Sequence, residues 1–220
     1  MKRELRETAD GSKTLFIEEL DEHYHSIHGA LAESRHVFIE AGLKFIDKDE
    51  IHILEIGFGT GLNLLTTLEA NETLKKRIFY TGVEAYPVLT EEVNKLSYEN
   101  LDIPELVQSL IPEIHDALWE KNHAITTLLS LKKEEKKFQE IRNQNEFDLI
   151  YFDAFAPSAQ PELWTEDVFK NMFKALKPSG ALVTYCAKGQ VKRNMKAVGF
   201  EIERLPGPPG KREMTRAIKA

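Results

Sequence analysis

The sequence contains a single cysteine, Cys186, among 220 residues, so the chain cannot close a disulfide within itself. It has no apolar run of the length that crosses a bilayer, and its opening, MKRELRETADG, is too charged for the core of a secretory signal. Around the histidines of the stretch YHSIH, no cysteine or carboxylate stands at metal-ligand spacing. We therefore expect a cytoplasmic protein that binds neither a membrane nor a metal.

The composition provides enough apolar residues for a sizeable core. Hydrophobic residues make up 42% and charged residues 30%, which in a chain of this length predicts one domain. The formal net charge is -7, yet the segment from Ala181 onward holds nine Lys or Arg and only three Glu. Such asymmetry permits a local surface for an anionic partner. It is equally compatible with a solvated surface that merely balances charge.

Apolar strands alternate with helices along most of the chain. Strands are predicted at 51–56, 78–83, 124–131, 148–152, 181–186, 201–205 and 213–218. Helices are predicted at 62–69, from 90, from 104, after the cap Thr165 and at 188–198, while 132–145 is a charged crossover, either helix or loop. A short strand at 14–17 and a helix at 29–41 come first, which predicts that residues 1–45 form an extension packed on a core domain of residues 46–220.

This alternation predicts an α/β fold with a mostly parallel sheet, helices on both of its faces and an antiparallel last strand. Ligands of such sheets bind at the carboxyl ends of the strands, where the strand order reverses. Two unusual stretches follow strands that are predicted to end there. One is the glycine-rich stretch after 51–56, and the other is FDAFAP, which closes the strand 148–152 with a carboxylate, an aromatic ring and a proline.

The glycine-rich stretch is Gly57-Phe58-Gly59-Thr60-Gly61-Leu62-Asn63, a turn that opens a helix. Glycines let the backbone approach a ligand closely. The spacing is G-x-G-x-G and not the G-x-G-x-x-G of dinucleotide sites, and Glu55 just before it would repel a pyrophosphate but pair with an ammonium. S-adenosyl-L-methionine carries an ammonium and no phosphate, so it fits this stretch better than NAD does.

Further carboxylates follow the neighbouring strands. Glu84 stands 23 residues beyond Gly61, close to the offset at which an acidic residue bonds ribose hydroxyls. The alternative for Glu55 and Glu84 is that they are ordinary strand-end carboxylates in water. Glu134 and Glu135 are candidates for contact with an adenine, although the charged run around them is typical of a solvated surface.

With these features, the sequence resembles the class I S-adenosyl-L-methionine-dependent methyltransferases, and more narrowly the methyltransferase half of the MnmC family. The resemblance rests on the glycine turn and on Tyr24-His25-Ser26 to Gly29, Glu33 to Phe38, Asp153-Ala154-Phe155-Ala156-Pro157 with Pro161 and Trp164, and Lys211-Arg212-Glu213-Met214. It implies a Rossmann-like, seven-stranded sheet. It also implies methylation of 5-aminomethyluridine, thiolated at position 2 or not, at the tRNA wobble position, with S-adenosyl-L-homocysteine as the product. The chain has no length for the flavin-dependent half of that family, so we expect a stand-alone methyltransferase without FAD.

The resemblance, together with position at a strand end, suggests roles for individual residues. Asp153 would hydrogen-bond the amine and orient its lone pair, while in-line alignment of the reacting atoms supplies most of the rate. Phe155 would stack on the flipped uracil, Pro157 would stiffen the loop, and Trp164 would either line the base pocket or anchor the next helix in the core. The residues expected to hold the cofactor are Glu55, Gly57, Phe58, Gly59, Gly61, Asn63 and Glu84, with Tyr24 and Ser26 either closing over its methionine end or forming a surface turn.

The basic C-terminal segment is expected to meet RNA. Lys188, Lys192 and Lys196 recur at spacings of four on one helix face, and Lys211 and Arg212 follow a Pro/Gly loop. These residues would bind phosphates of the anticodon stem-loop, with the wobble base unstacked into the pocket. The alternatives are a methyltransferase of a small-molecule amine, a non-catalytic module that binds a cofactor or RNA, and an NAD oxidoreductase.

Overall fold

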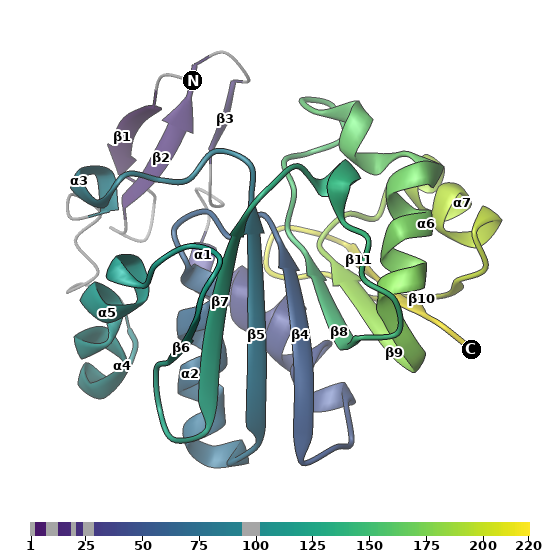
Figure 1. Ribbon diagram of the computed structural model, residues 1–220. Helices are drawn as coiled ribbons and strands as arrows, with labels where there is room; N and C mark the ends of the chain where they lie inside the picture. The colour runs from purple at the N-terminus through teal and green to yellow at the C-terminus, as the bar shows by residue number, and fades with distance from the viewer. Residues whose placement is uncertain (1–2, 8–12, 19–20, 24–28, 94–101) are drawn as a thin grey trace.

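The most apolar runs of the sequence form the centre of one large sheet (Figure 1). The computed structural model describes residues 3–7, 13–18, 21–23, 29–93 and 102–220. Strand β8, Phe147–Phe152, is buried at every position, and its neighbour β4, Glu50–Ile56, is buried at all positions but the first and third. Parallel strands covered on both faces have such continuous apolar sequences. The strands predicted at 148–152 and 51–56 are therefore confirmed.

The strand order is β10-β11-β9-β8-β4-β5-β7-β6. The remaining strands of this sheet are β5 Arg77–Glu84, β6 Asn122–Ala124, β7 Leu129–Glu135, β9 Leu176–Thr184, β10 Glu201–Pro206 and β11 Glu213–Ile218. Strands β7, β5, β4, β8 and β9 are parallel, whereas β11 pairs antiparallel with both β9 and β10. The predicted mostly parallel sheet with an antiparallel last strand is confirmed. The count of seven strands was one too low, because the short β6 adds an antiparallel edge beside β7.

Helices cover both faces of the sheet (Figure 1). Ile53 and Leu149 point to one face and share an apolar cluster with α1, η1 and α2, while Leu54 and Ile150 point to the other and pack with α6 and α7. This alternation along each strand is the period of two that a pleated strand imposes. The helical elements are α1 Ala30–Ser34, η1 Arg35–Glu40, η2 Leu43–Phe45, α2 Leu62–Leu74, α3 Thr90–Val93, α4 Glu105–Ser109, α5 Ile111–Asp116, η4 Phe138–Glu140, η5 Pro161–Trp164, α6 Glu166–Ala175 and α7 Gly189–Ala197.

The N-terminal segment forms a small sheet of its own. It consists of β1 Arg3–Glu7, β2 Lys13–Ile17 and β3 Glu22–His23, in that order. Arg3 fastens it to the segment after β5, because its guanidinium donates to the Pro87 carbonyl at 3.3 Å and pairs with Glu92 at 2.9 Å. Within the described ranges, no helix is both long and apolar enough to cross a membrane.

The charged run at 132–135 is part of β7, and the expectation of a crossover there is wrong. Lys133 and Glu134 are buried there, and the interior tolerates their charges because each has a partner. Lys133 is buried, and its ammonium donates to the carbonyls of Ile114 and His115 at the end of α5, at 3.0 and 2.8 Å. Burial lowers the pKa of Lys133 to about 8. Glu134 is also buried, between Lys132 at 2.5 Å and Lys136 at 2.7 Å, whereas Glu135 and Lys137 are exposed, so only part of the run is a solvated surface.

Candidate active site

The site lies at the carboxyl ends of the strands, at the point where the strand order reverses. From β4 the chain moves outward to β5 and β7, and it then returns to β8 on the other side of β4. Gly57 follows β4 and Asp153 follows β8, and the Asp153 N–H donates to the Ile56 carbonyl at 2.9 Å. A Cβ atom on Gly57 would lie 2.4 Å from the Asp153 carbonyl oxygen, so only glycine fits there. The two stretches singled out in the sequence therefore meet at the expected position.

The glycine turn is built on left-handed backbone. Gly57, Gly59 and Gly61 have φ angles of 88°, 51° and 79°. The N–H groups of Gly57 and Phe58 both donate to the Val83 carbonyl, at 3.0 and 3.1 Å, which ties the turn to β5. The Phe58 ring is buried against the backbone of β5, so this side chain supports the turn from within the protein.

Glu84 ends β5 with a carboxylate directed at the glycine turn. Its Oε2 accepts the Gly59 N–H at 3.1 Å, and its Oε1 accepts the Tyr86 N–H at 3.0 Å. Burial raises the pKa of Glu84, while the two backbone donors act to lower it. A carboxylate oxygen has more than one lone pair. Glu84 therefore keeps capacity to accept from a further donor, as contact with ribose hydroxyls would need.

Asp153 ends β8 with a carboxylate in a poorly solvated position. Its Oδ2 accepts a hydrogen bond from Asn63 Nδ2 at 2.7 Å. Burial raises the pKa of Asp153 to about 7; the Asn63 bond and the charge of Lys211 oppose this rise, and the charge of Glu33 adds to it. A carboxyl group with such a pKa changes its protonation state near neutrality, which is the behaviour required of a general base.

A second set of charged groups lies beside Asp153. Lys211 Nζ pairs with Glu33 Oε1 at 2.8 Å and lies 4.1 Å from the centroid of the Tyr185 ring. The Tyr185 hydroxyl donates to the Ala154 carbonyl at 2.8 Å, in the loop that follows Asp153. Lys211 was expected to contact RNA phosphates, but its ammonium is held by a carboxylate and an aromatic ring. It connects the C-terminal loop to α1 across the end of the sheet.

Two residues predicted to hold the cofactor lie beneath the site. Glu55 is fully buried, and its oxygens accept from Asn63 Nδ2 and from the Tyr80 hydroxyl, both at 2.8 Å. Burial raises the pKa of Glu55 well above its usual value. Because Glu55 exposes no surface, the expectation that it pairs with an ammonium is wrong. Asn63 is 4% exposed and its amide hydrogen-bonds within the protein, and its contact with the cofactor stays a prediction.

Trp164 belongs to the core and not to a base pocket. Its side chain is 2% exposed, its ring centroid is 5.0 Å from that of Phe152, and its Nε1 donates to the Phe155 carbonyl at 2.8 Å. The expectation that Trp164 lines the substrate pocket is wrong, and the alternative of a core anchor is right. Phe155 and Pro157 are half-buried on the loop after Asp153, and their contact with substrate stays a prediction.

The predicted stripe of three lysines on α7 is interrupted. Lys188 and Lys196 are exposed, but Lys192 is buried next to Glu213, with 3.2 Å between the ammonium and the carboxylate. The stripe was therefore wrong at its middle residue, because a carboxylate from β11 draws that lysine inward. Arg212 is exposed, at the same edge of the sheet as Lys188.

Sequence reasoning missed four residues that complete this arrangement: Glu33, Ser34, Tyr80 and Tyr185. Glu33 and Ser34 lie in a stretch that served only to support the family resemblance. Tyr80 and Tyr185 belong to or follow apolar strands, and there a signal was present. A buried tyrosine hydroxyl needs a hydrogen-bond partner, so a tyrosine in such a strand indicates a nearby polar group.

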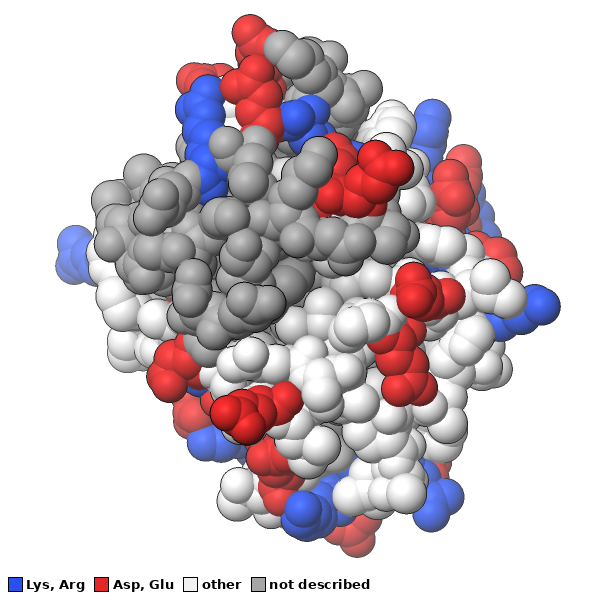
Figure 2. All heavy atoms as spheres, turned by 90° about the vertical axis from the view of Figure 1, so that its left-hand side faces the viewer, with Lys and Arg blue, Asp and Glu red and all other residues white. Residues whose placement is uncertain are grey.

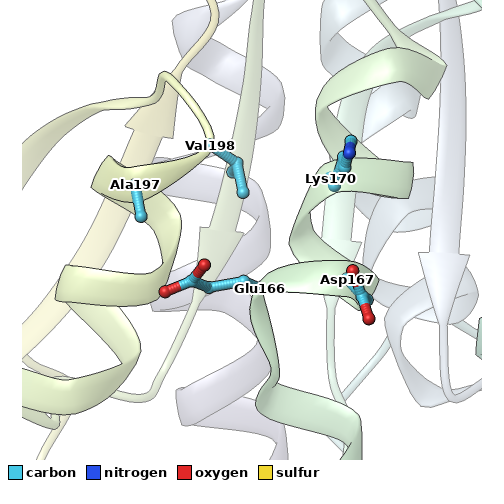
Figure 3. A pocket seen from close by; sticks show the side chains of 5 residues that line it. All are labelled: Glu166, Asp167, Lys170, Ala197 and Val198. Carbon is cyan, nitrogen blue, oxygen red and sulfur yellow. The ribbon is translucent and has the colours of Figure 1, made fainter.

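Other parts of the molecule do not join the site. Tyr24 and Ser26 lie outside the described residues. An open hollow lies between α6 and α7, with Glu166 directed toward α7 (Figure 3). It is lined by Glu166, Asp167, Lys170, Ala197 and Val198. None of the predicted site residues is among them.

Comparison with known proteins agrees with this geometry. The curated relatives include the tRNA 5-methylaminomethyl-2-thiouridine biosynthesis bifunctional protein MnmC of Cupriavidus necator, 33% identical over 90% of this chain and 32% of its own length. The protein of the same name from Leptospira interrogans is 30% identical, again over 90% of this chain and 32% of its own length. The chain thus spans about a third of the length of these relatives.

Solved structures share the fold. MnmC2 from Aquifex aeolicus superposes with a TM-score of 0.78 at 26% identity, covering 98% of this chain and 69% of that one. Spermidine synthase from Thermotoga maritima has a TM-score of 0.66 at 15% identity, covering 99% and 69%, and shows the fold alone. A family model described as S-adenosyl-L-methionine-dependent methyltransferase matches residues 105–220, just over half of the chain. The chain therefore belongs to the S-adenosyl-L-methionine-dependent methyltransferase family.

Proposed function

We propose that this protein methylates the amine of 5-aminomethyluridine, thiolated at position 2 or not, at the wobble position of tRNA. The observation that carries the proposal is Asp153, a carboxylate with a pKa of about 7 beside the glycine turn, in a chain that matches MnmC proteins over 90% of its length. The printed name of those relatives supplies the substrate class, and Asp153 supplies a group suited to an amine. The family membership leaves the NAD oxidoreductase alternative without support.

The residues at the strand ends where the strand order reverses fit S-adenosyl-L-methionine. The left-handed glycine turn presents backbone, and the Glu84 carboxylate beside it has the acceptor capacity for ribose hydroxyls. S-adenosyl-L-methionine carries no phosphate group, and the Glu84 carboxylate would repel one. When bound there, the cofactor supplies an electrophilic methyl group on a sulfonium. We propose that Glu84 and the turn from Gly57 to Gly61 hold it.

Asp153 would prepare the amine. A primary amine is largely protonated at neutral pH and is then no nucleophile, so the site has to accept its proton or favour its neutral form. With a pKa of about 7, Asp153 is ionised in a large fraction of molecules at neutrality and can accept a hydrogen bond from the amine. Holding the nitrogen in line with the methyl group would then supply most of the acceleration.

The exposed cations at the C-terminal edge are suited to phosphates. Lys188, at the start of α7, and Arg212, in the loop between β10 and β11, are both exposed near the strand ends where Asp153 lies. Arg204 on β10 is exposed as well. The face over α4 and α5 is different: acidic groups are scattered over it, and Lys and Arg lie mainly around its margin (Figure 2). We propose that tRNA approaches from the side of Lys188 and Arg212.

A second candidate is methylation of a small-molecule amine. The observation that favours it is charge, since the chain carries a formal net charge of -7 and an acidic face that would not attract RNA. This candidate uses the same Asp153 and the same cofactor site. Only the substrate differs.

A methyl-transfer assay tests the proposal. Labelled S-adenosyl-L-methionine is incubated with the protein and either tRNA that carries the aminomethyl group or free 5-aminomethyluridine. We expect methylation of the tRNA and little of the free nucleoside. Preference for the free nucleoside would establish the second candidate, and methylation of neither would overturn both.

The Asp153→Ala variant provides the matching control of the site. We expect it to bind S-adenosyl-L-homocysteine with a modest loss and to methylate on the order of 100-fold more slowly or worse, the usual contribution of a positioned base. Turnover equal to that of the wild type would eliminate the role assigned to Asp153.

A further inference from the structure

Asn63 occupies the centre of a buried polar cluster. Its Nδ2 donates to Asp153 Oδ2 at 2.7 Å and to Glu55 Oε1 at 2.8 Å. Its Oδ1 accepts the Ser34 hydroxyl at 2.6 Å. The amide lies at the start of α2 and is 4% exposed; its bonds to Glu55 and Ser34 are buried, and its bond to Asp153 is partly buried.

These bonds fix which way the amide faces. The Ser34 hydroxyl donates to Oδ1, and both hydrogens of Nδ2 are then directed at carboxylate oxygens, which can only accept when ionised. The opposite orientation would bring an oxygen against two carboxylates. The partners are themselves held, because Ser34 Oγ lies 2.8 Å from Thr66 Oγ1 and the Tyr80 hydroxyl donates to Glu55 at 2.8 Å. A satisfied network of this kind is rigid.

We propose that Asn63 is a positioning residue for Asp153. The amide holds Oδ2 of Asp153 in one orientation and leaves Oδ1 to receive the substrate amine. It also favours the ionised form of the carboxylate, since it donates a hydrogen bond to it. The inference deepens the proposed function and rests on the role of Asp153 in it. It also reassigns Asn63, which the sequence had suggested as a cofactor ligand.

Other charged and titratable groups that face Asp153 also affect its pKa. Glu33 from α1 raises the pKa of Asp153, and Lys211 from the β10–β11 loop lowers it. Glu55 and Tyr80 lie beneath; burial raises the pKa of each of them, and the charge of Asp153 adds to the rise. Asn63, in contrast, donates a hydrogen bond directly to the Asp153 carboxylate, at 2.7 Å. Its removal should therefore shift the pKa of Asp153 upward.

The direct test is the titration of the Asp153 carboxyl carbon by NMR, with Asp153→Asn used to assign the signal. In Asn63→Ala we expect the midpoint to move up by about one pH unit, because a hydrogen bond to a charged group is lost. The matched control is Asn71→Ala. Asn71 is a buried amide of the same helix, but it bonds the backbone of Lys76 at the other end. We expect its loss to leave the Asp153 midpoint unchanged, and equal midpoints in wild type and Asn63→Ala would overturn the inference.

A second variant covers the case in which Asn63→Ala does not fold. Ser34→Ala removes the donor that fixes the amide and leaves Nδ2 in place, so we expect a smaller upward shift of the same midpoint. No shift in Ser34→Ala, with Asn63→Ala unfolded, would also contradict the inference.

The activity of these variants separates this inference from the proposed function. If wild type methylates tRNA, the acid limb of its rate profile should move to higher pH in Asn63→Ala, and an unmoved limb would overturn the positioning role alone. If wild type methylates no tRNA, the proposed function fails, whereas the NMR titration still decides whether Asn63 controls Asp153.

Discussion

Asp153 is the residue to which we assign the proposed chemistry, and the fold places its carboxylate where the charge is poorly solvated. Burial raises the pKa of Asp153 to about 7, well above the usual value for an aspartate. Its neighbours act in opposite directions, with Glu33 raising the pKa and Lys211 and Asn63 lowering it. A carboxylate placed where its charge is poorly solvated is typical of a functional site.

The free energy of unfolding should depend on pH because of this poorly solvated carboxylate. Because the folded pKa of Asp153 lies above its unfolded value, the folded state binds more protons between pH ~4 and ~7, and stability falls as pH rises through that window. Asp153→Asn removes this charge. We expect the variant to be more stable than wild type by about 2 kcal/mol at pH 8 and the two to converge below pH ~4. Denaturant unfolding at both pH values measures the difference, and equal stability at pH 8 would count against a destabilised carboxylate.

Substitution of Lys211 and substitution of Glu33 should shift the pH dependence of methylation in opposite directions. Lys211→Met removes a positive charge near Asp153, so the acid limb of the methylation rate should move to higher pH, by about half a unit. Glu33→Gln removes a negative charge and should move it to lower pH. Both variants break the same 2.8 Å ion pair. Shifts of the same sign would therefore indicate that disruption of the pair, and not charge, is responsible.

At the scale of secondary-structure elements, the sequence predicted those strands and helices that depend on local residue patterns. Continuous apolar runs identified β4 and β8, and the cap Thr165 identified the start of α6, in which Val168, Phe169 and Met172 are buried. It failed at β7, where Lys133 is buried because the distant helix α5 supplies its carbonyl partners, and Glu134 is buried between Lys132 and Lys136. The bond between Asn63 and Asp153 joins residues 90 positions apart, and no local pattern indicates it.

The contact between β5 and the glycine turn makes a prediction at this scale. A Cβ atom on Gly82 would lie 2.3 Å from the Phe58 ring, so Gly82→Ala should displace that ring and deform the turn. Overpacking of this kind costs about 1–3 kcal/mol, and we expect S-adenosyl-L-homocysteine to bind on the order of tenfold more weakly by calorimetry. Gly189→Ala is the control, because its Cβ would meet only the end of Arg193 at 3.4 Å. Equal affinity in both variants would show that Phe58 does not support the cofactor site.

At the scale of the whole molecule, charge is divided between faces. The chain is acidic overall, and acidic groups are prominent over α4 and α5 (Figure 2). The C-terminal segment carries the excess of Lys and Arg that composition indicated, with Lys188 and Arg212 exposed at the carboxyl edge of the sheet. This separation would orient an anionic partner toward the strand ends where Asp153 lies.

Salt dependence tests that orientation. Each phosphate contact adds close to one to the slope of log affinity against log salt, so Arg212→Ala should lower the slope for tRNA by about one. Arg77→Ala is the matched control, since Arg77 is exposed at the start of β5, at the opposite edge of the sheet. A flat salt dependence in wild type, or equal slopes in the two variants, would contradict phosphate contacts at Arg212.

The central claim is that this chain methylates the wobble aminomethyl group, and nucleoside mass spectrometry of cellular tRNA tests it most directly. In cells that lack the protein, we expect 5-methylaminomethyluridine, with or without the 2-thio group, to disappear and the 5-aminomethyl form to accumulate in its place. An unchanged nucleoside profile in those cells would contradict the account.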